Sequence, residues 1–262
     1  MTQQSNITTA HVWQPSDFDT PQIRAVRVDL AACLRMAAHL GLAEGICNHF
    51  SVLVPGHDDL FMVNPFGLAF TEVTPSSLLI CDFNGQVVCG SGVPETTAFF
   101  IHAQVHRLQP KAVAVLHTHM PNATALAMLE GDPLRWAGQT ALKFYGRVAV
   151  DDGFNGLALD AREGQRIAAA MGNAQVLFMK NHGVMVTGAD LSLAWDDLYY
   201  LERAAEVQIR AMSTGVPLQP VTPEIAAKTA AQMRIGEAHS ARAHLDSVIR
   251  QLNLQQPSFS QH

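Results

Sequence analysis

The apolar residues of the chain change their spacing repeatedly, and this alternation constrains the fold more than any other feature. They recur at helical spacing over residues 22–40, whereas residues 50–88 break into short β-like runs bounded by turn residues. The run at 112–119 is too short and too rich in β-branched residues for a free helix, which predicts a buried strand. Strands interleaved with helices predict an α/β domain in which helices cover a central mixed or antiparallel sheet.

The rest of the chain continues this order. The Asn84-Gly85 pair between two apolar runs predicts a β-hairpin, and Pro94-Glu95 opens a helix that ends near Pro110. Further helices are expected over residues 122–129, 162–171, 191–214 and 223–253, and strands over 50–54, 60–63, 78–82, 86–89, 176–179 and 184–187.

The pattern divides the chain into three parts. Residues 1–20 are polar and lack periodicity, so we expect a flexible N-terminal arm there. We expect one domain over residues 21–214 and a C-terminal helical extension over residues 215–262.

Charge and cysteine content narrow the class of protein. The 262 residues include 17 Lys and Arg against 23 Asp and Glu, a net charge of −6, which argues against nucleic acid as a partner because phosphates require a basic face. The 4 cysteines form no CxxC motif and are expected to be reduced thiols. The sequence has no apolar stretch of about eighteen residues and no export signal, so we expect a cytoplasmic protein without a membrane partner.

Three histidines are candidate metal ligands. In His117-Thr118-His119, the first and third residues of a strand face the same side about 6.6 Å apart, so that two imidazoles can reach one ion. His182, in Asn181-His182-Gly183, is the candidate third ligand, because glycine permits a tight turn beside it. A His-x-His pattern also arises by chance among 12 histidines, so the spacing alone is equally consistent with ordinary core or surface histidines.

Glu95 lies at the expected start of a helix, immediately after Gly92-Val93-Pro94. A carboxylate in the first turn stabilises a helix through its dipole, and this structural role accounts for the position by itself. The alternative is catalytic, because the same positive end of the helix would keep Glu95 ionised near a metal, ready to move a proton.

Two other groups of polar residues are expected to be structural. His102 and His106 are four residues apart on one helix, but no glutamate follows the first histidine, so the zinc-protease pattern is absent and packing or surface positions are expected. Asn48-His49-Phe50-Ser51 lies where a helix gives way to a strand, and a turn capped by the asparagine side chain explains it.

Taken together, these motifs resemble those of the class II aldolase/adducin family over residues 22–214, and their order and spacing agree with it. The Asn-His-Phe-Ser turn and the Tyr-Tyr-Leu-Glu-Arg helix look most like its adducin-like bacterial branch. The motifs that carry the resemblance are Gly45 with Asn48-His49-Phe50-Ser51, Asn64-Pro65-Phe66-Gly67, Pro94-Glu95, Leu116-His117-Thr118-His119, Lys180-Asn181-His182-Gly183 and Tyr199-Tyr200-Leu201-Glu202-Arg203-Ala204.

The resemblance implies a three-layer α/β/α domain with a central, mainly antiparallel sheet. It implies that His117, His119 and His182 bind a divalent metal, most often zinc, with manganese, cobalt or iron(II) as alternatives. Family members commonly form tetramers with sites at subunit boundaries, so we expect a homo-oligomer, either a tetramer or a dimer.

The same resemblance assigns roles around the metal. Glu95 becomes the acid or base that moves a proton beside it, acting on a small-molecule substrate. The candidates for binding that substrate are Asn48, Asn64, Lys180 and Tyr199.

This sequence departs from the sugar-phosphate aldolases of the family where they hold a phosphate. Those enzymes have small hydroxyl residues before the glutamate and a Thr-Gly-containing loop, whereas this chain has Gly92-Val93-Pro94 and Asn64-Pro65-Phe66-Gly67. Valine and proline carry no hydroxyl, and proline carries no backbone N–H. We therefore expect a substrate without a phosphate group.

The expected function is that of a metal-dependent lyase, which cleaves a C–C bond next to a carbonyl or carboxylate by retro-aldol reaction or decarboxylation. Two alternatives stay open at this point. One is a non-haem iron(II) oxygenase that uses the same three histidines, and the other is a non-catalytic, adducin-like interaction module.

Overall fold

The structure is a computed structural model that describes residues 13–256 and 259–260. Most of the expected N-terminal arm, residues 1–12, lies outside the described residues. The remainder includes a short 3-10 helix, Pro15–Phe18, whose Phe18 side chain is buried in the main apolar cluster.

Eight strands of the described chain form one sheet in the order β4-β3-β2-β1-β5-β8-β7-β6. Neighbouring strands are antiparallel except β6 and β7, so the prediction of a mainly antiparallel central sheet is confirmed. The strands are β1 (His49–Leu53), β2 (Leu60–Val63), β3 (Leu79–Asp82), β4 (Val87–Cys89), β5 (Ala114–Thr118), β6 (Val148–Asp151), β7 (Val176–Met179) and β8 (Gly183–Gly188).

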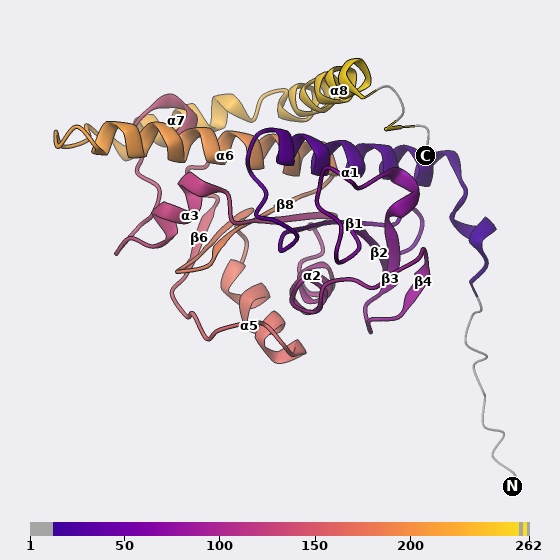
Figure 1. The fold of residues 1–262 in the computed structure, drawn as a ribbon. Coiled ribbons are helices and arrows are strands. Elements are labelled where there is room, and N and C mark those ends of the chain that lie inside the picture. Colours follow the sequence, from indigo (N-terminus) through magenta and orange to yellow (C-terminus); the bar gives the residue numbers. More distant parts are fainter. Residues whose placement is uncertain (1–12, 257–258, 261–262) are drawn as a thin grey trace, which may run out of the picture.

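Helices cover both faces of this sheet, as Figure 1 shows. α1 and α6 lie across one face, with α8 packed on their outer side, and α2 and α5 lie on the other face, which confirms the three-layer α/β/α arrangement. The helices are α1 (Pro21–His39), α2 (Thr96–Leu108), α3 (Pro121–Ala127), α4 (Gln139–Leu142), α5 (Ala161–Met171), α6 (Leu191–Met212), α7 (Pro223–Met233) and α8 (Glu237–Gln255), and a 3-10 turn spans Pro75–Ser77.

The central strands present different side chains to the two helical layers because strand residues alternate in direction. Phe50 of β1 and Leu116 of β5 are fully buried in the cluster beneath α1 and α6. Their neighbours Ser51 and Val115 face the other layer, where Ser51 bonds to α2 and Val115 packs with apolar residues of α2 and α5. Polar residues at alternate positions of β1 and β5 therefore lie beneath α2.

The C-terminal half differs from the expected elements in three places, the first of which is the short helix α4, which was not expected. β6 also has no counterpart among the expected elements, because this edge strand contains four half-buried or buried residues and is too short to show a clear alternation. The helical segment expected over residues 223–253 consists of two helices, which Gly236 separates with a left-handed φ of 74°.

The C-terminal extension packs against the side of α1 and α6 that faces away from the sheet, as Figure 1 shows. Leu245, Val248 and Leu252 of α8 are buried in the cluster that contains side chains of both helices. The extension thus covers the outer side of the helical layer on that face of the sheet.

A group of buried ion pairs, called here the ion cluster, joins α8 to α6. Lys143 Nζ lies 2.7 Å from Asp197 Oδ1 and 2.9 Å from Glu237 Oε1. Arg147 Nη2 lies 2.5 Å from Asp197 Oδ2, and Arg147 Nη1 lies 3.2 Å from Glu237 Oε1. Because both cations contact Asp197 of α6 and Glu237 of α8, they bind the start of α8 to the domain.

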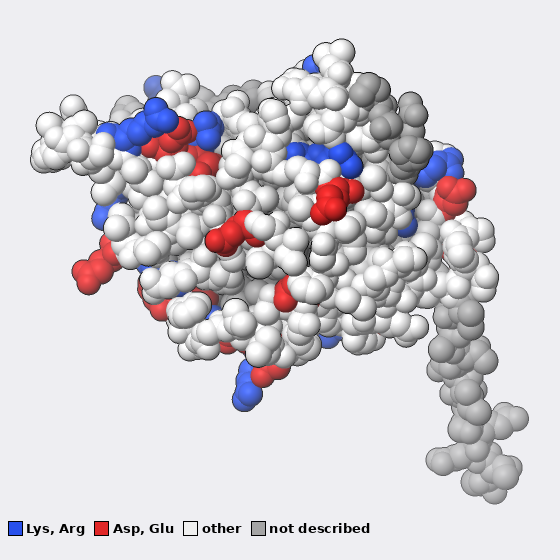
Figure 2. Space-filling model, in the orientation of Figure 1, with Lys and Arg blue, Asp and Glu red and all other residues white. Residues whose placement is uncertain are grey.

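Charged side chains lie in small mixed groups on the face of the molecule that Figure 2 shows. Lys and Arg lie beside Asp and Glu there, and most of that surface is uncharged. Among the described residues, no helix has an apolar stretch long enough to cross a membrane.

Candidate metal centre

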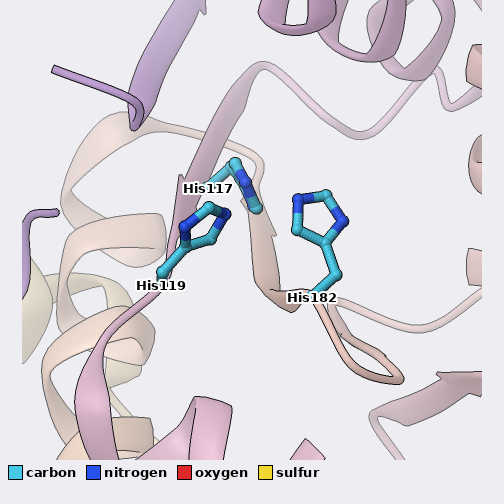
Figure 3. Close-up of side chains that lie close together, drawn as sticks. All are labelled: His117, His119 and His182. Atoms are coloured by element: carbon cyan, nitrogen blue, oxygen red, sulfur yellow. The ribbon is translucent and has the colours of Figure 1, made fainter. Parts of the chain in front are cut away.

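Three histidine side chains meet at the edge of the sheet where β5 ends and β8 begins. His117 is on β5, His119 follows that strand, and His182 lies in the turn before β8. Antiparallel pairing of Thr118 with Val184 brings these segments side by side. One nitrogen of each ring lies within 4.8 Å of the others, and Figure 3 shows the three rings gathered together. The structure therefore brings together the three residues that the sequence predicts as ligands.

In the rings of His117 and His119, a hydrogen bond at one nitrogen determines that the other nitrogen stays free. His117 Nδ1 donates to the carbonyl oxygen of Val184 at 2.9 Å, and His119 Nδ1 donates to the carboxylate of Glu44. These bonds place the proton on Nδ1, so that Nε2 keeps its lone pair. The buried Nε2 of His119 has no hydrogen-bond partner among the described residues. This arrangement fits a divalent cation, which requires such free lone pairs.

The environment keeps the imidazoles of His117 and His182 neutral. Burial lowers the pKa of His117 well below its usual value, and the nearby rings of His182 and His49 lower it further. Burial, followed by the ring of His119, lowers the pKa of His182 to about 4. Neutral imidazole is the form that binds a metal, and three nitrogen ligands without a carboxylate suit zinc while leaving a position for substrate.

Gly183 allows the turn after β7 to approach His119 closely. A Cβ atom at this position would lie 2.7 Å from the carbonyl oxygen of Thr118 and 2.8 Å from His119 Cδ2. Asn181 in the same turn has a left-handed φ of 58°. The tight turn that presents His182 to the other two rings thus depends on the absence of a side chain at position 183.

Glu95 is the N-cap of α2. Its Oε2 accepts hydrogen bonds from the backbone N–H of Ala98 at 2.8 Å and from the Thr97 hydroxyl, and His49 Nε2 lies 3.4 Å from the same oxygen. Burial would raise the pKa of Glu95, but the contact with His49 Nε2 and the hydrogen bonds from Thr97 and Ala98 outweigh it and lower the pKa to about 2. The carboxylate is therefore ionised at neutral pH and available to accept a proton.

His49 connects Glu95 to the three histidines. The prediction that residues 48–51 form a capped turn does not include this role. It is the first residue of β1 and lies opposite His117 of β5. Its ring is 3% exposed and stacks on the His117 ring with 5.4 Å between centroids. The polar alternation of His49 and Ser51 along β1 is the sequence signal for this position, but it gives no indication of the partners.

His102 and His106 are packing residues, and neither is at the surface. His102 Nδ1 and His106 Nε2 both bond to the Ser51 hydroxyl, at 2.7 and 2.8 Å, and His106 Nδ1 donates to the carbonyl oxygen of Ala112 at 2.7 Å. His102 also packs edge-on against the His49 ring, with 5.6 Å between centroids. Burial lowers the pKa of His106 to about 4 and that of His102 well below its usual value. Both rings are therefore neutral, and the ring of His102 packs directly against His49.

Asn48 and Asn64, the candidate substrate-binding amides, lie next to each other and are buried. Asn64 Nδ2 donates to the carbonyl oxygen of Asn48 at 3.2 Å, and Asn64 Oδ1 accepts from the N–H of Phe50 at 3.0 Å. Asn48 Oδ1 accepts from the N–H of Glu44 at 2.7 Å, whereas its buried Nδ2 has no partner in the described chain. Asn48 therefore retains a donor group, while both ends of the Asn64 amide are occupied.

The other two candidates make contacts elsewhere. Lys180 Nζ donates to the carbonyl oxygens of Leu129 and Gly131, at 2.5 and 2.6 Å. The Tyr199 ring packs edge-on against His244 of α8, with 4.9 Å between centroids. These contacts hold a loop and a helix pair, and neither includes the three histidines.

Comparison with known proteins identifies the class to which this fold and site belong. The sequence matches the class II aldolase and adducin N-terminal domain over residues 28–209, and the chain belongs to that family. A Caulobacter vibrioides protein named for aldolase class 2 is 33% identical over 238 residues, which cover 89% of this chain and 91% of that protein.

Two further relatives carry names that describe a reaction. Decarboxylase NovR of Streptomyces niveus is 32% identical over 224 residues, which cover 84% of this chain and 82% of NovR. A Streptomyces roseochromogenus subsp. oscitans protein named 4-hydroxy-3-prenylphenylpyruvate oxygenase/4-hydroxy-3-prenylbenzoate synthase is 31% identical over 223 residues, which cover 84% of this chain and 80% of that protein.

Solved structures confirm the fold class. An aldolase II superfamily protein from Pseudomonas syringae has a TM-score of 0.87 at 34% identity, covering 94% of this chain and 98% of its own. L-fuculose 1-phosphate aldolase from Glaciozyma antarctica PI12 has a TM-score of 0.80 at 25% identity, covering 90% of this chain and 92% of its own.

Proposed function

We propose that this protein is a metal-dependent lyase that cleaves a C–C bond next to a carbonyl or carboxylate, by retro-aldol reaction or decarboxylation. The observation that carries the proposal is the cluster of His117, His119 and His182. The buried ring of His49 lies between this cluster and the ionised Glu95, because it contacts both His117 and Glu95. The three imidazoles would hold the cation, which is zinc in the first place and otherwise manganese, cobalt or iron(II). When bound, the cation supplies a Lewis acid where negative charge develops on the substrate.

The residues around the cluster have separate tasks in this proposal. Glu95 accepts a proton from the substrate and returns it to the carbon that the broken bond leaves. His49, Thr97 and the N–H of Ala98 hold the Glu95 carboxylate in one orientation before substrate enters. Asn48 uses its free Nδ2 to donate to a substrate oxygen.

Two neighbouring loops support a substrate without a phosphate group. The N–H of Phe66 donates to the carbonyl oxygen of Val93 at 2.9 Å, so this backbone donor is already occupied. Phe66 and Val93 are 52% and 61% exposed and present apolar surface, and Val93 lies two residues before Glu95 in the chain. A phosphate requires several free donors, whereas this surface suits an apolar part of a carboxylate substrate.

The relatives support the reaction type. The likeness to decarboxylase NovR supports cleavage next to a carboxylate, and the likeness to L-fuculose 1-phosphate aldolase supports the retro-aldol form. We further propose a homo-oligomer, either a tetramer or a dimer, which light scattering of the purified protein tests.

The experiment combines metal analysis with a substrate screen. The purified protein is analysed for bound metal, loaded with Zn²⁺, Mn²⁺, Co²⁺ or Fe²⁺, and supplied with hydroxy-keto acids and aromatic carboxylates. Replacing the carboxylate in Glu95→Gln is expected to lower turnover by roughly 10²–10⁴-fold while leaving the metal content unchanged. Turnover at the parent rate in this variant would show that Glu95 does not move the proton.

An iron(II) oxygenase is the second candidate, because a relative that is 31% identical carries an oxygenase name. Oxygen consumption separates the two reactions. A lyase consumes no oxygen, whereas an oxygenase consumes it only when ferrous iron is present.

A further inference from the structure

We infer that Glu44 is a positioning residue of the metal centre and sets the affinity of that centre for its cation. The inference rests on the proposed function, since it takes His119 as a ligand. Glu44 lies in the connection between α1 and β1, and its carboxylate accepts the Nδ1–H of His119. A carboxylate in this position orients the imidazole and makes its Nε2 a stronger electron donor.

His119 depends on such a contact more than His117 does. His117 lies within β5, whose backbone pairs with β1 and β8 on its two sides, and a carbonyl oxygen of β8 holds its ring. The pairing of β5 with β8 ends at Thr118, so His119 lies beyond the ladder. Glu44 provides the hydrogen bond that fixes the His119 ring, because strand pairing does not reach it.

Two buried asparagines hold Glu44 in place. The N–H of Glu44 donates to Asn48 Oδ1 at 2.7 Å, and the carbonyl oxygen of Glu44 accepts from the N–H of Cys47 at 3.1 Å. Asn64 Nδ2 in turn donates to the carbonyl oxygen of Asn48, and Asn64 Oδ1 accepts from the N–H of Phe50 on β1. This chain of hydrogen bonds, called here the asparagine brace, connects the sheet to the carboxylate that holds His119.

The asparagine brace indicates that Asn64 supports the metal centre rather than binding substrate. Asn64 is 5% exposed and both ends of its amide are bonded to backbone. Removing it would therefore act on the metal through Glu44. The Glu44 side chain itself is 66% exposed, so truncating it opens no cavity and leaves the fold intact.

The test is a cation-affinity measurement that needs no substrate. Metal-free parent protein, Glu44→Ala and Glu44→Gln are titrated with Co²⁺, followed by its visible absorption, and with Zn²⁺ against a competing chelator. Glu44→Ala is expected to lower the affinity for both cations by roughly 10–100-fold. Glu44→Gln is expected to lose less, because its amide oxygen still accepts the hydrogen bond without the charge. Glu224→Ala, which removes an exposed carboxylate from α7, is the matched control and is expected to bind like the parent.

A double-mutant cycle tests the brace. Asn64→Ala is expected to weaken binding in the parent and to add little in the Glu44→Ala background, because both changes act through the same carboxylate. Affinity within twofold of the parent in Glu44→Ala overturns the inference while leaving the proposed function intact. A parent protein that binds neither cation overturns both.

Discussion

The ring of His49 stacks on the ring of His117, with 5.4 Å between their centroids. The same His49 ring approaches Glu95 through Nε2, so one side chain contacts both a candidate ligand and the candidate proton carrier. His102 also packs against the His49 ring and is itself bonded to Ser51. A buried set of rings therefore connects Glu95 to the three-histidine cluster.

Removing the contact between His49 and Glu95 should raise the pKa of Glu95. His49→Phe keeps an aromatic ring in the stack but has no ring nitrogen beside the carboxylate, and burial of Glu95, which raises its pKa, is then less opposed. We expect the Glu95 pKa to rise from about 2 towards its usual value of 4.5, as carboxyl-carbon NMR of the metal-free protein would show. His239→Phe, at an exposed position on α8, is the control, and an unchanged Glu95 pKa in His49→Phe would contradict the assigned contact.

A methyl group at position 183 should weaken the metal site. The new Cβ would lie 2.8 Å from His119 Cδ2, so the ring must move away from the other two histidines. We expect Gly183→Ala to lower Zn²⁺ affinity by roughly tenfold or more, measured by chelator competition. Gly188→Ala, at the other end of β8, is the control, because its new Cβ would lie 2.7 Å from the backbone N of Ala194. We expect this variant to lose about 1–3 kcal/mol of unfolding free energy but to bind Zn²⁺ normally. Equal Zn²⁺ affinities in the two variants would count against this steric explanation.

The buried neutral ring of His106 should make the protein less stable in acid. Its pKa is about 4 in the folded state against a usual 6.5, so below pH 6.5 the unfolded chain binds a proton that the folded chain does not. Between pH 7 and pH 5 this removes about 2 kcal/mol of unfolding free energy. His106→Gln cannot titrate, and its urea-unfolding free energy should fall by about 2 kcal/mol less over the same range. Identical pH dependence in parent and variant would exclude His106 as the source.

Breaking the ion cluster should destabilise the protein and loosen α8. Asp197→Ala leaves Lys143 with Asp196 and Glu237 and leaves Arg147 with Glu237, and losing one member of a buried charge network costs about 3–5 kcal/mol. We expect this loss of unfolding free energy in urea, together with faster protease cleavage between α6 and α7. Arg162→Ala removes an exposed pair with Asp160 and should change stability by less than about 1 kcal/mol. A loss as small as this in Asp197→Ala would show that Asp196 and Glu237 satisfy both cations.

Local patterns were enough to predict most of the fold. The first helix was predictable because Thr20 caps it and Pro21 begins it, and both features are visible in the residues themselves. The hairpin at Asn84-Gly85 was predictable for the same reason, since Gly85 adopts the positive φ that its turn needs. β6 escaped prediction because an edge strand of this length shows little periodicity and depends on its pairing with β7.

The candidate site was predictable only where its residues are close in the chain or carry a motif. His117 and His119 are two residues apart, so strand alternation allows them to share an ion, and the family resemblance adds His182 as the third ligand. Nothing in the sequence points to Glu44, because its partner His119 is 75 residues away. Lys180 lies two residues before His182 and is a predicted substrate-binding residue, but its ammonium group donates to two backbone carbonyls. Sequence neighbours of a ligand need not share its environment.

The ladder between β5 and β8 has a consequence for when the protein can acquire a cation. Val184, which holds His117, comes 67 residues after it, and the turn that carries His182 is placed only once β8 has joined the centre of the sheet. A chain still emerging from the ribosome without that strand has two of the three imidazoles and no enclosure for them. With the three histidines as the proposed ligands, loading would follow formation of the central strand pair, and cation occupancy would report on whether the middle of the sheet has closed.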